Sequence, residues 1–337
     1  MEYRYLGRSG MQVSRYCLGA MMFGGPTPEA ESREIITAAR DFGINFIDTA
    51  DAYNGGESEA VVGRSIKADR DWWVLATKLA NKLDAGNPNS GGYSRRWIQL
   101  AVEGSLRRLD TEVIDILYLH KEDHRVAIDD AVMALGDLIR AGKIRAFGLS
   151  NHRGWRVAAF CEACDRLGVP RPVVSQPYYN IMNRMPETEH LPACAAYGLG
   201  VVPYSPLARG VLTGKYAANV TPEEGSRAAR KDKRMMETEW RHESLEIVQT
   251  IKTHAEAKGA SPIDLAVGWV LNNRLITGCI AGPRTMEQWK SYERALGYTF
   301  TAEDEALIDS LVAPGHPSTP GYNDPQYPLE GRKSRAG

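Results

Sequence analysis

Long apolar runs and an excess of charge of one sign are both missing from this 337-residue sequence. No apolar run approaches the roughly 20 residues of a membrane-spanning helix, and the opening stretch, "MEYRYLGRSG", lacks the apolar centre of a signal peptide. Lysine and arginine together number 41, against 42 aspartate and glutamate residues. We therefore predict neither a membrane nor a nucleic acid as a partner.

Cysteine is also scarce. The five cysteines are Cys17, Cys161, Cys164, Cys194 and Cys279. An odd and scattered set fits free thiols in a reducing compartment, so we expect a cytoplasmic protein. The "CEAC" pair, Cys161 and Cys164, allows two interpretations: a redox pair or structural thiols. It lies inside a helix-like run, residues 155–167, with no strand directly before it, which favours structural thiols.

The length and the composition of the chain fit a globular α/β protein. Barrels of this class take about 250 residues plus insertions, and a chain of this length can bury a sizeable core without disulfides or metals. Apolar residues make up 43% and charged residues 25% of the sequence, which is typical of globular rather than disordered proteins.

Short β-rich runs alternate with amphipathic helical patterns along most of the chain. The predicted strands end at Gly19, Asp48, Lys78, His120, Ser150–Asn151, Gln176, Ser205 and Gly282. The helical patterns cover residues 28–43, 94–109, 127–142, 244–259, 261–273, 285–297 and 301–312. Eight such units in series predict a (β/α)8 TIM barrel. The alternative is a doubly wound sheet, but "GAMMFGG" after the first strand lacks its usual glycine fingerprint.

Two segments stand outside this repeat. Residues 211–240 are long, polar and charged, and residues 313–337 form a Pro/Gly-rich C-terminal tail. Loops of such length in a compact domain are usually functional or mobile. We predict a single domain, residues 1–337, with the barrel core at about 14–312 and with long loops over its C-terminal face.

Polar side chains cluster at the predicted C-terminal ends of the strands, where barrel active sites lie. They are Asp48, Lys78, His120, Ser150, Asn151, Gln176 and Ser205, with Tyr53 shortly after Asp48. Each alone has a structural interpretation, such as a helix cap, a solvated charge or a satisfied core histidine. Their joint position at the strand ends predicts an active site.

Several motifs, in order, resemble the aldo-keto reductase superfamily. They are "GINFIDTADAY", "LATK", "IDILYLH", "GLSN", "SQPYYN", "PYSPLARGVLTGK" and "GPRTMEQW". The similarity runs from "YLGRSGMQVS" to about Val312. It implies an NADPH-dependent oxidoreductase that reduces aldehydes or ketones to alcohols by hydride transfer. The partner would be a small-molecule carbonyl compound.

The resemblance also assigns catalytic roles. Tyr53 would be the general acid, and Lys78 would favour its phenolate and lower its pKa from about 10. Asp48 would hold Lys78 charged and fixed. His120 would donate a hydrogen bond to the carbonyl oxygen of the substrate. No such role falls to Asp51, which we expect to be a loop or cap residue.

The same resemblance implies a site for NADPH/NADP+ across the barrel mouth. The implied cofactor-binding residues are Gly19, Met21, Ser150, Asn151, Gln176, Tyr204, Ser205, Leu207, Arg209, Lys215, Gly282, Arg284 and Gln288. Tyr204 would stack on the nicotinamide ring, and Arg284 would pair with the 2′-phosphate at the start of a helix. Ser291 and Tyr292 depart from the Glu and Asn that family members often carry there for adenine.

An apolar substrate pocket is predicted beside the cofactor. Its candidate lining residues are Met22, Phe23 and Tyr179, and flexible methionines there suggest tolerance of varied aldehydes. The sequence does not determine the physiological substrate, the direction of the reaction or the oligomeric state.

Three other functions are compatible with parts of the pattern. "HKEDH" places His120 and His124 around two carboxylates as a possible metal site, although no further ligand cluster stands out and we predict no metal. Lys78 alone would suit a Schiff-base aldolase. The beta subunits of voltage-gated potassium channels resemble the same family, so a cofactor-binding regulatory subunit is the alternative to an enzyme.

Overall fold

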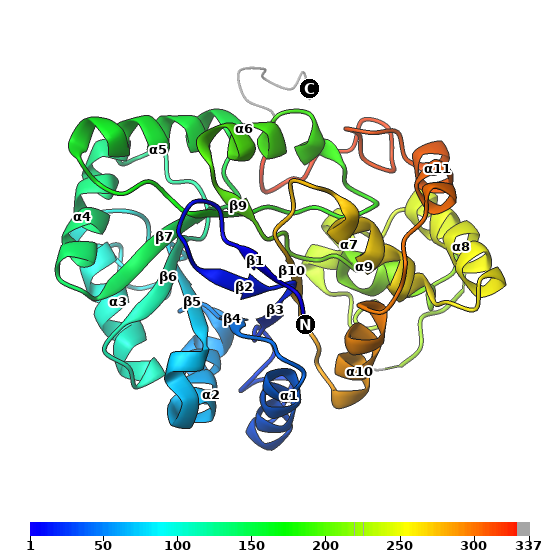
Figure 1. The fold of residues 1–337 in the computed structure, drawn as a ribbon, viewed down its shortest axis with the longest axis horizontal. Coiled ribbons are helices and arrows are strands. Elements are labelled where there is room, and N and C mark those ends of the chain that lie inside the picture. The colour runs from blue at the N-terminus through cyan, green and yellow to red at the C-terminus, as the bar shows by residue number, and fades with distance from the viewer. Residues whose placement is uncertain (219, 225, 329–337) are drawn as a thin grey trace.

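Eight parallel strands form one sheet that curves into a nearly closed barrel (Figure 1). The computed structural model describes residues 1–218, 220–224 and 226–328. In spatial order the strands are β10 (Cys279–Ala281), β3 (Tyr16–Gly19), β4 (Phe46–Asp48), β5 (Val74–Leu79), β6 (Ile114–Leu119), β7 (Ile144–Ser150), β8 (Val174–Gln176) and β9 (Gly200–Val201). Just beyond β9, Pro203 O accepts a 2.9 Å hydrogen bond from Ile280 N of β10. The predicted TIM barrel is confirmed.

Helices surround this barrel (Figure 1). They are α1 (Glu29–Asp41), α2 (Glu57–Ile66), α3 (Arg95–Leu109), α4 (Ile128–Arg140), α5 (Gly154–Leu167), α6 (His190–Tyr197), α7 (Lys233–Thr238), α8 (His242–Ala257), α9 (Pro262–Asn272), α10 (Met286–Ala295) and α11 (Ala302–Leu311). Short 3-10 helices cover Tyr53–Gly56, Lys67–Trp72, Met185–Glu187 and Ala208–Thr213. All seven helical patterns of the sequence correspond to helices, within about two residues at each end. None of the helices in the described ranges is both long enough and apolar enough to cross a membrane.

Several helices begin at side chains that bond free backbone groups. Ser94 accepts a hydrogen bond from Trp97 N at the start of α3. A reciprocal capping box joins Ser261 and Asp264 at the start of α9. Each cap satisfies a backbone N–H that the first turn would otherwise leave unpaired.

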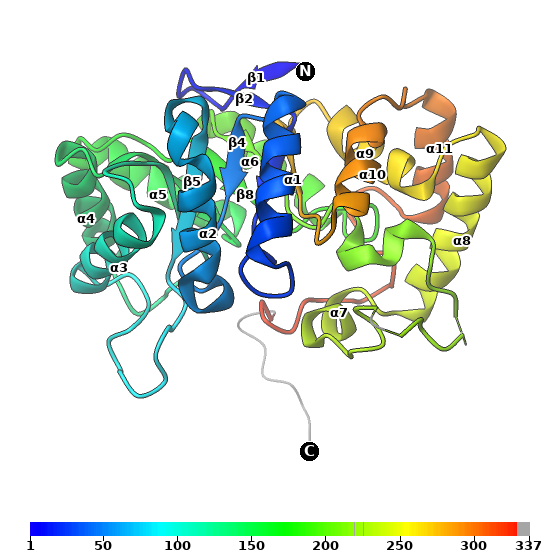
Figure 2. The same cartoon turned by 90° about the horizontal axis from the view of Figure 1, so that it is seen from below.

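A short hairpin closes the N-terminal end of the barrel and was not predicted. Strands β1 (Tyr3–Tyr5) and β2 (Gln12–Ser14) pair antiparallel, and Leu6 and Val13 are fully buried with residues of the barrel interior. Figure 2 shows this hairpin at the end of the molecule opposite the C-terminal tail. The open face of the barrel is therefore the one at the C-terminal ends of its strands.

The two segments outside the repeat meet over this open face. Arg234 of α7 pairs with Asp324 of the tail at 2.6 Å, and the guanidinium of Arg241 lies 3.8 Å from the ring centre of Tyr322. Figure 2 shows α7 and the tail side by side at the same end of the barrel. Residues 219, 225 and 329–337 of these predicted segments lie outside the described residues.

Candidate active site

The strand ends bring the predicted polar residues to one rim. Asp48 ends β4, Lys78 is the second-last residue of β5, His120 follows β6, and Ser150 and Gln176 end β7 and β8. Ser150 and Gln176 are direct neighbours in the β7–β8 pairing. The strands are parallel, so their carboxyl ends share one face of the barrel.

The ammonium group of Lys78 joins the acidic and phenolic side chains into one chain. Its Nζ donates to a carboxylate oxygen of Asp48, to Thr49 O at 2.8 Å and to the hydroxyl of Tyr53 at 3.3 Å. Gln176 Nε2 donates to the other oxygen of Asp48 at 3.0 Å. Lys78 is 0% exposed and Asp48 is 2% exposed, so this ion pair is shielded from water. The predicted Asp–Lys–Tyr arrangement is therefore present in the fold.

Burial and charge act in opposite directions on this chain. Burial alone would lower the pKa of Lys78, but the carboxylate of Asp48 and then Tyr53 raise it above its usual value, so the lysine stays charged. Burial raises the pKa of Tyr53, and the charge of Lys78 opposes that rise without cancelling it. Lys78 thus acts on Tyr53 in the expected direction, but burial dominates and keeps the phenol protonated at neutral pH.

His120 lies beside the phenol as a neutral imidazole. The two rings are 5.7 Å apart and nearly perpendicular, at 81°. Burial, followed by the charges of Lys78 and Lys121, holds the pKa of His120 well below its usual range. A neutral imidazole N–H and a phenol O–H side by side can both donate to one carbonyl oxygen.

Asn81 also belongs to this site, although no sequence motif pointed to it. Its Nδ2 lies 3.0 Å from Nδ1 of His120. Asn81 follows β5 by two residues, after Ala80, whose φ of +112° is unusual for a residue other than glycine. Only this backbone geometry brings the amide to the histidine, so no sequence pattern could have identified it.

The predicted nicotinamide contacts form a second connected group next to His120. Asn151 has a positive φ of +57°, and its Nδ2 donates to His120 O at 2.9 Å. Its Oδ1 accepts a 2.7 Å hydrogen bond from the hydroxyl of Tyr204. The ring of Tyr204 stacks on Tyr178 at 5.7 Å. These contacts fix the amide of Asn151 and the aromatic ring of Tyr204 at the rim of the barrel.

Further predicted cofactor residues lie near the neighbouring strands β10 and β3. Gly19 ends β3, paired with Asp48 of β4, and Gly282 follows β10 directly. Arg284 precedes α10, and its backbone N–H donates to Gln288 Oε1 at 2.8 Å. No heavy atom lies within 4 Å of a Cβ built on Gly282, so the backbone there is open to a ligand.

The "SPLARG" segment turns sharply past β9. Ser205 and Arg209 both have positive φ angles, +58° and +51°. Arg209 Nε donates to Thr238 Oγ1 of α7 at 3.2 Å, while Leu207 is buried. Lys215 follows the turn, with its Nζ 5.1 Å from the ring centre of Tyr216. These residues form the side of the rim that faces the long charged segment.

A hollow of about 420 Å³ opens directly above Tyr53. It is lined by Met21, Met22, Pro26, Ala52, Tyr53, Asn54, Arg227, Arg230 and Asp232. Met21 and Met22 therefore line the same hollow as Tyr53. Arg227 and Arg230 come from the long charged segment and were not among the predicted site residues.

Phe23 and Tyr179 lie elsewhere than the predicted substrate pocket. Phe23 is 0% exposed and Tyr179 is 1% exposed, and both pack in the main apolar core. The hydroxyl of Tyr179 donates to Glu187 at 2.7 Å, and its ring packs on Trp269 at 5.0 Å. Both side chains are held by core contacts, so neither lines the hollow above Tyr53.

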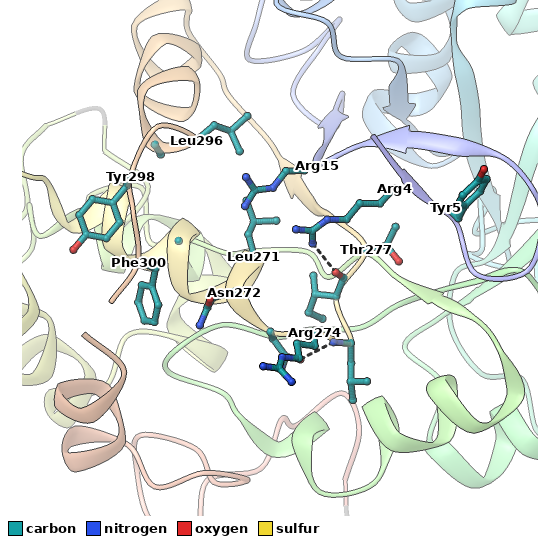
Figure 3. Close-up of a pocket in the computed structure, with 15 residues that line it drawn as sticks. Arg4, Tyr5, Arg15, Leu271, Asn272, Arg274, Thr277, Leu296, Tyr298 and Phe300 are labelled. Carbon is teal, nitrogen blue, oxygen red and sulfur yellow. Dashed lines mark hydrogen bonds between the residues drawn. The ribbon is translucent and has the colours of Figure 1, made fainter. Parts of the chain in front are cut away.

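A second hollow, of about 500 Å³, lies near the hairpin, at the other end of the barrel (Figure 3). It is bordered by Arg4, Arg15 and Arg274, and by the last residues of α9 and α10. Arg4 donates to Ile276 O at 3.1 Å. Guanidinium groups at helix C-termini satisfy free carbonyl groups and the helix dipole. None of the predicted catalytic residues lines this hollow, so we do not assign the active site to it.

Asp51 lies in the expected turn but does not cap a helix. It is 2% exposed, and neither carboxyl oxygen has a hydrogen-bond partner among the described residues. Burial, and then the nearby carboxylate of Glu59, raise the pKa of Asp51 to about 8. The side chain is therefore a neutral acid at pH 7.

The metal and redox alternatives find little support in the geometry. His124 pairs with Glu122 at 3.1 Å, whereas His120 faces Asn81. Within the described ranges, no group of three or more His, Cys, Asp or Glu side chains could hold a metal ion. Cys161 and Cys164 lie buried on α5, and burial raises the pKa of each thiol to about 12, which disfavours the reactive thiolate.

His152, which lies just after β7, is expected to make the stability of the fold depend on pH. His152 is buried between Ser150 O, at 2.8 Å from Nδ1, and the hydroxyl of Tyr93, at 3.1 Å from Nε2. Burial lowers the pKa of His152 from 6.5 to about 4. The unfolded chain then binds a proton that the folded chain does not, so stability is lost as pH falls from 6.5 towards 4, by up to roughly 3 kcal/mol.

Urea unfolding at pH 7 and pH 4.5 measures this loss. We expect His152→Gln to lose less stability than the wild type between the two pH values. His242→Gln, at a histidine side chain that is 60% exposed, is the control and should lose as much as the wild type. An equal loss in His152→Gln and the wild type would contradict the prediction.

Known proteins resemble the chain over almost its full length. The family model described as "Aldo/keto reductase family" matches residues 15–313. A protein of Oryza sativa subsp. japonica named "Probable voltage-gated potassium channel subunit beta" is 33% identical, over 96% of this chain and 100% of its own length. An L-glyceraldehyde 3-phosphate reductase of Escherichia coli O157:H7 is 31% identical, over 94% and 93%. A versiconal hemiacetal acetate reductase of Aspergillus parasiticus is 33% identical, over 81% and 86%.

Proposed function

The chain belongs to the aldo/keto reductase family, and from that premise we propose that it reduces aldehydes or ketones to alcohols with NADPH. The observation that carries the proposal is the buried chain from Asp48 through Lys78 to Tyr53, with neutral His120 beside the phenol. Carbonyl reduction needs a proton donor and a polarising group at one oxygen atom, and these residues supply both.

Asp48, Lys78, Tyr53 and His120 each have one task in this reaction. Bound NADPH supplies the hydride to the carbonyl carbon. Tyr53 gives its hydroxyl proton to the developing alkoxide, and Lys78, 3.3 Å from that hydroxyl, stabilises the phenolate that remains. Asp48 keeps Lys78 charged and in place. His120 donates a hydrogen bond to the same oxygen and orients it.

The rim residues fit a dinucleotide. Ser150, Asn151 and Gln176 supply the amide and hydroxyl groups that a carboxamide needs, and the ring of Tyr204 offers an aromatic surface. The remaining contacts would come from Gly19 and Met21 near the ring and from Ser205, Leu207, Arg209, Lys215, Gly282, Arg284 and Gln288 near the phosphates. Arg227, half-buried in the hollow above Tyr53, would add a further positive charge.

Arg284 is the residue that we propose selects NADPH over NADH. Its guanidinium has no hydrogen bond to a described residue, and it lies at the start of α10, where anions bind well. Arg284→Gln is expected to raise the Kd for NADPH about 10-fold or more, because a charge-assisted contact is lost. The Kd for NADH should stay within about twofold, since NADH lacks the 2′-phosphate.

Fluorescence titration with both cofactors tests this proposal. Arg274→Gln makes the same change in the hollow at the other end of the barrel and serves as the control. Equal weakening of NADPH and NADH by Arg284→Gln would mean that the residue supports the fold of the site rather than the 2′-phosphate.

The substrate class follows from the hollow above the phenol. Met21 and Met22 are flexible side chains, and Met21 is 39% exposed, so the wall can adapt to different shapes. We propose tolerance of varied aldehydes. The five free, buried cysteines fit a cytoplasmic enzyme, where thiols stay reduced. The test is the decrease in absorbance of NADPH with aliphatic, aromatic and dicarbonyl compounds, and turnover of one class alone would contradict broad tolerance.

A second candidate function is that of a cofactor-binding regulatory subunit. Similarity to the rice protein named as a potassium channel beta subunit, over its full length, favours it. The same panel separates the two functions. Turnover supports the reductase, whereas NADPH binding without turnover of any compound favours the regulatory role.

A further inference from the structure

Among the described residues, one side chain forms a hydrogen bond with the imidazole of His120. Nδ2 of Asn81 lies 3.0 Å from Nδ1 of His120. Nδ2 of an amide can only donate, so Nδ1 must accept. In a neutral ring the single proton then lies on Nε2. Nε2 makes no hydrogen bond to a described residue, so its N–H remains available to a ligand.

The position of the single proton matters because the ring of His120 is neutral. Lys78 on β5 and Lys121 next to the histidine repel a second proton, and the phenol of Tyr53 is the third titratable group against the ring. A protonated ring would donate from both nitrogens whatever its neighbours. A neutral ring donates from one nitrogen only, and the wrong tautomer would face the substrate oxygen with a lone pair.

The backbone before Asn81 is held in an unfavourable conformation. Ala80 has a φ of +112°, although it is not a glycine, and it is buried, at 3% exposed. Its carbonyl accepts from Gly92 N at 3.0 Å, and the carbonyl of Leu79 accepts from His120 N at 2.9 Å. Strained residues persist only where the surrounding structure holds them, and they cluster at functional sites. The conformation here directs the side chain of Asn81 towards the rim.

We propose that Asn81 is a positioning residue that holds His120 in the tautomer with its proton on Nε2. The N–H that donates to the substrate carbonyl is then always present. The catalytic consequence rests on the proposed reductase function, whereas the tautomer itself does not. The chemistry of Asn81 is specific: a donor is needed, and an acceptor at the same place would draw the proton to Nδ1.

The direct test is nitrogen NMR of protein labelled with 15N-histidine. His120 is assigned from the signal that disappears in His120→Gln. We expect the wild-type spectrum to show Nδ1 without a proton and Nε2 with one. Asn81→Asp should move the proton to Nδ1 or charge the ring, and Asn81→Leu should give a mixture of the two tautomers. Asn89→Asp makes the same chemical change at an exposed position of the same loop and should leave the signal unchanged.

Kinetics give the second measurement. Asn81→Asp is expected to lower kcat/KM for aldehydes about 10²-fold, in the range for a lost oxyanion donor, with NADPH affinity within about twofold of the wild type. A new ionisation should enter its pH profile, because a carboxylate against Nδ1 raises the pKa of the imidazole. A merely structural effect of the variant would not add that ionisation.

Two results would overturn the proposal. One is a proton on Nδ1 in the wild type, which would mean that the amide faces the ring with its oxygen. The other is an unchanged tautomer in both Asn81→Asp and Asn81→Leu. If the tautomer shifts as expected but no aldehyde is reduced by the wild type, the role of Asn81 stands and the proposed reductase function fails.

Discussion

Tyr53→Phe is expected to lower kcat/KM for aldehyde reduction about 10³-fold while NADPH still binds. Among the described residues, the phenol is the only acidic group that both lies within 3.3 Å of the buried ammonium of Lys78 and belongs to a residue lining the hollow, so none of them replaces it as the proton donor. General acid catalysis typically contributes about 10²–10⁴-fold. The change removes one oxygen atom and leaves the Asp48–Lys78 pair intact, so the fold should be preserved.

The matched control is Tyr118→Phe. Tyr118 on β6 also lies near Lys78, with its ring centre 5.9 Å from Nζ against 4.9 Å for Tyr53, but it is fully buried inside the barrel. The same loss of a hydroxyl there should change kcat/KM less than about threefold, because Tyr118 cannot touch a substrate. The measurement is the initial rate of NADPH oxidation over a range of aldehyde concentrations for both variants, which gives kcat/KM. Full activity in Tyr53→Phe would show that the phenol is not the proton donor.

The sequence predicted the barrel and its rim because both depend on local patterns. Each predicted strand is a short apolar run that ends in a turn signal or a polar residue, and the rim residues lie at or just after the ends of these runs. The β1–β2 hairpin was missed because it gains its stability from burial of Leu6 and Val13 in the barrel. Such burial is a tertiary effect.

Other features of the site depend on how distant segments meet. Asn81 reaches His120 only through the unusual φ of Ala80, and Arg227 reaches the hollow only because its loop folds over the rim. The pKa of Tyr53 likewise depends on the balance of burial against one charge, which a sequence does not reveal. Phe23 follows the first barrel strand closely, yet it turns into the core.

The second large effect expected is the loss of stability in Lys78→Met. The variant leaves the carboxylate of Asp48, which is 2% exposed, without its cation. Removing one partner of a buried ion pair typically costs about 3–5 kcal/mol, because the remaining charge is desolvated and unpaired. The midpoint of urea unfolding should fall accordingly. Lys67→Met breaks the exposed pair with Asp110 and should cost less than about 1 kcal/mol.

A double variant separates stability from catalysis. Asp48→Asn together with Lys78→Met replaces the buried pair by neutral groups of similar size, and the new amide can still accept from Gln176 Nε2. Replacing both partners is often close to neutral, so most of the lost stability should return. Activity should not return, because no ammonium remains to stabilise the phenolate of Tyr53. If the double variant were as unstable as Lys78→Met, the cost would come from lost packing around the lysine stem rather than from an uncompensated charge.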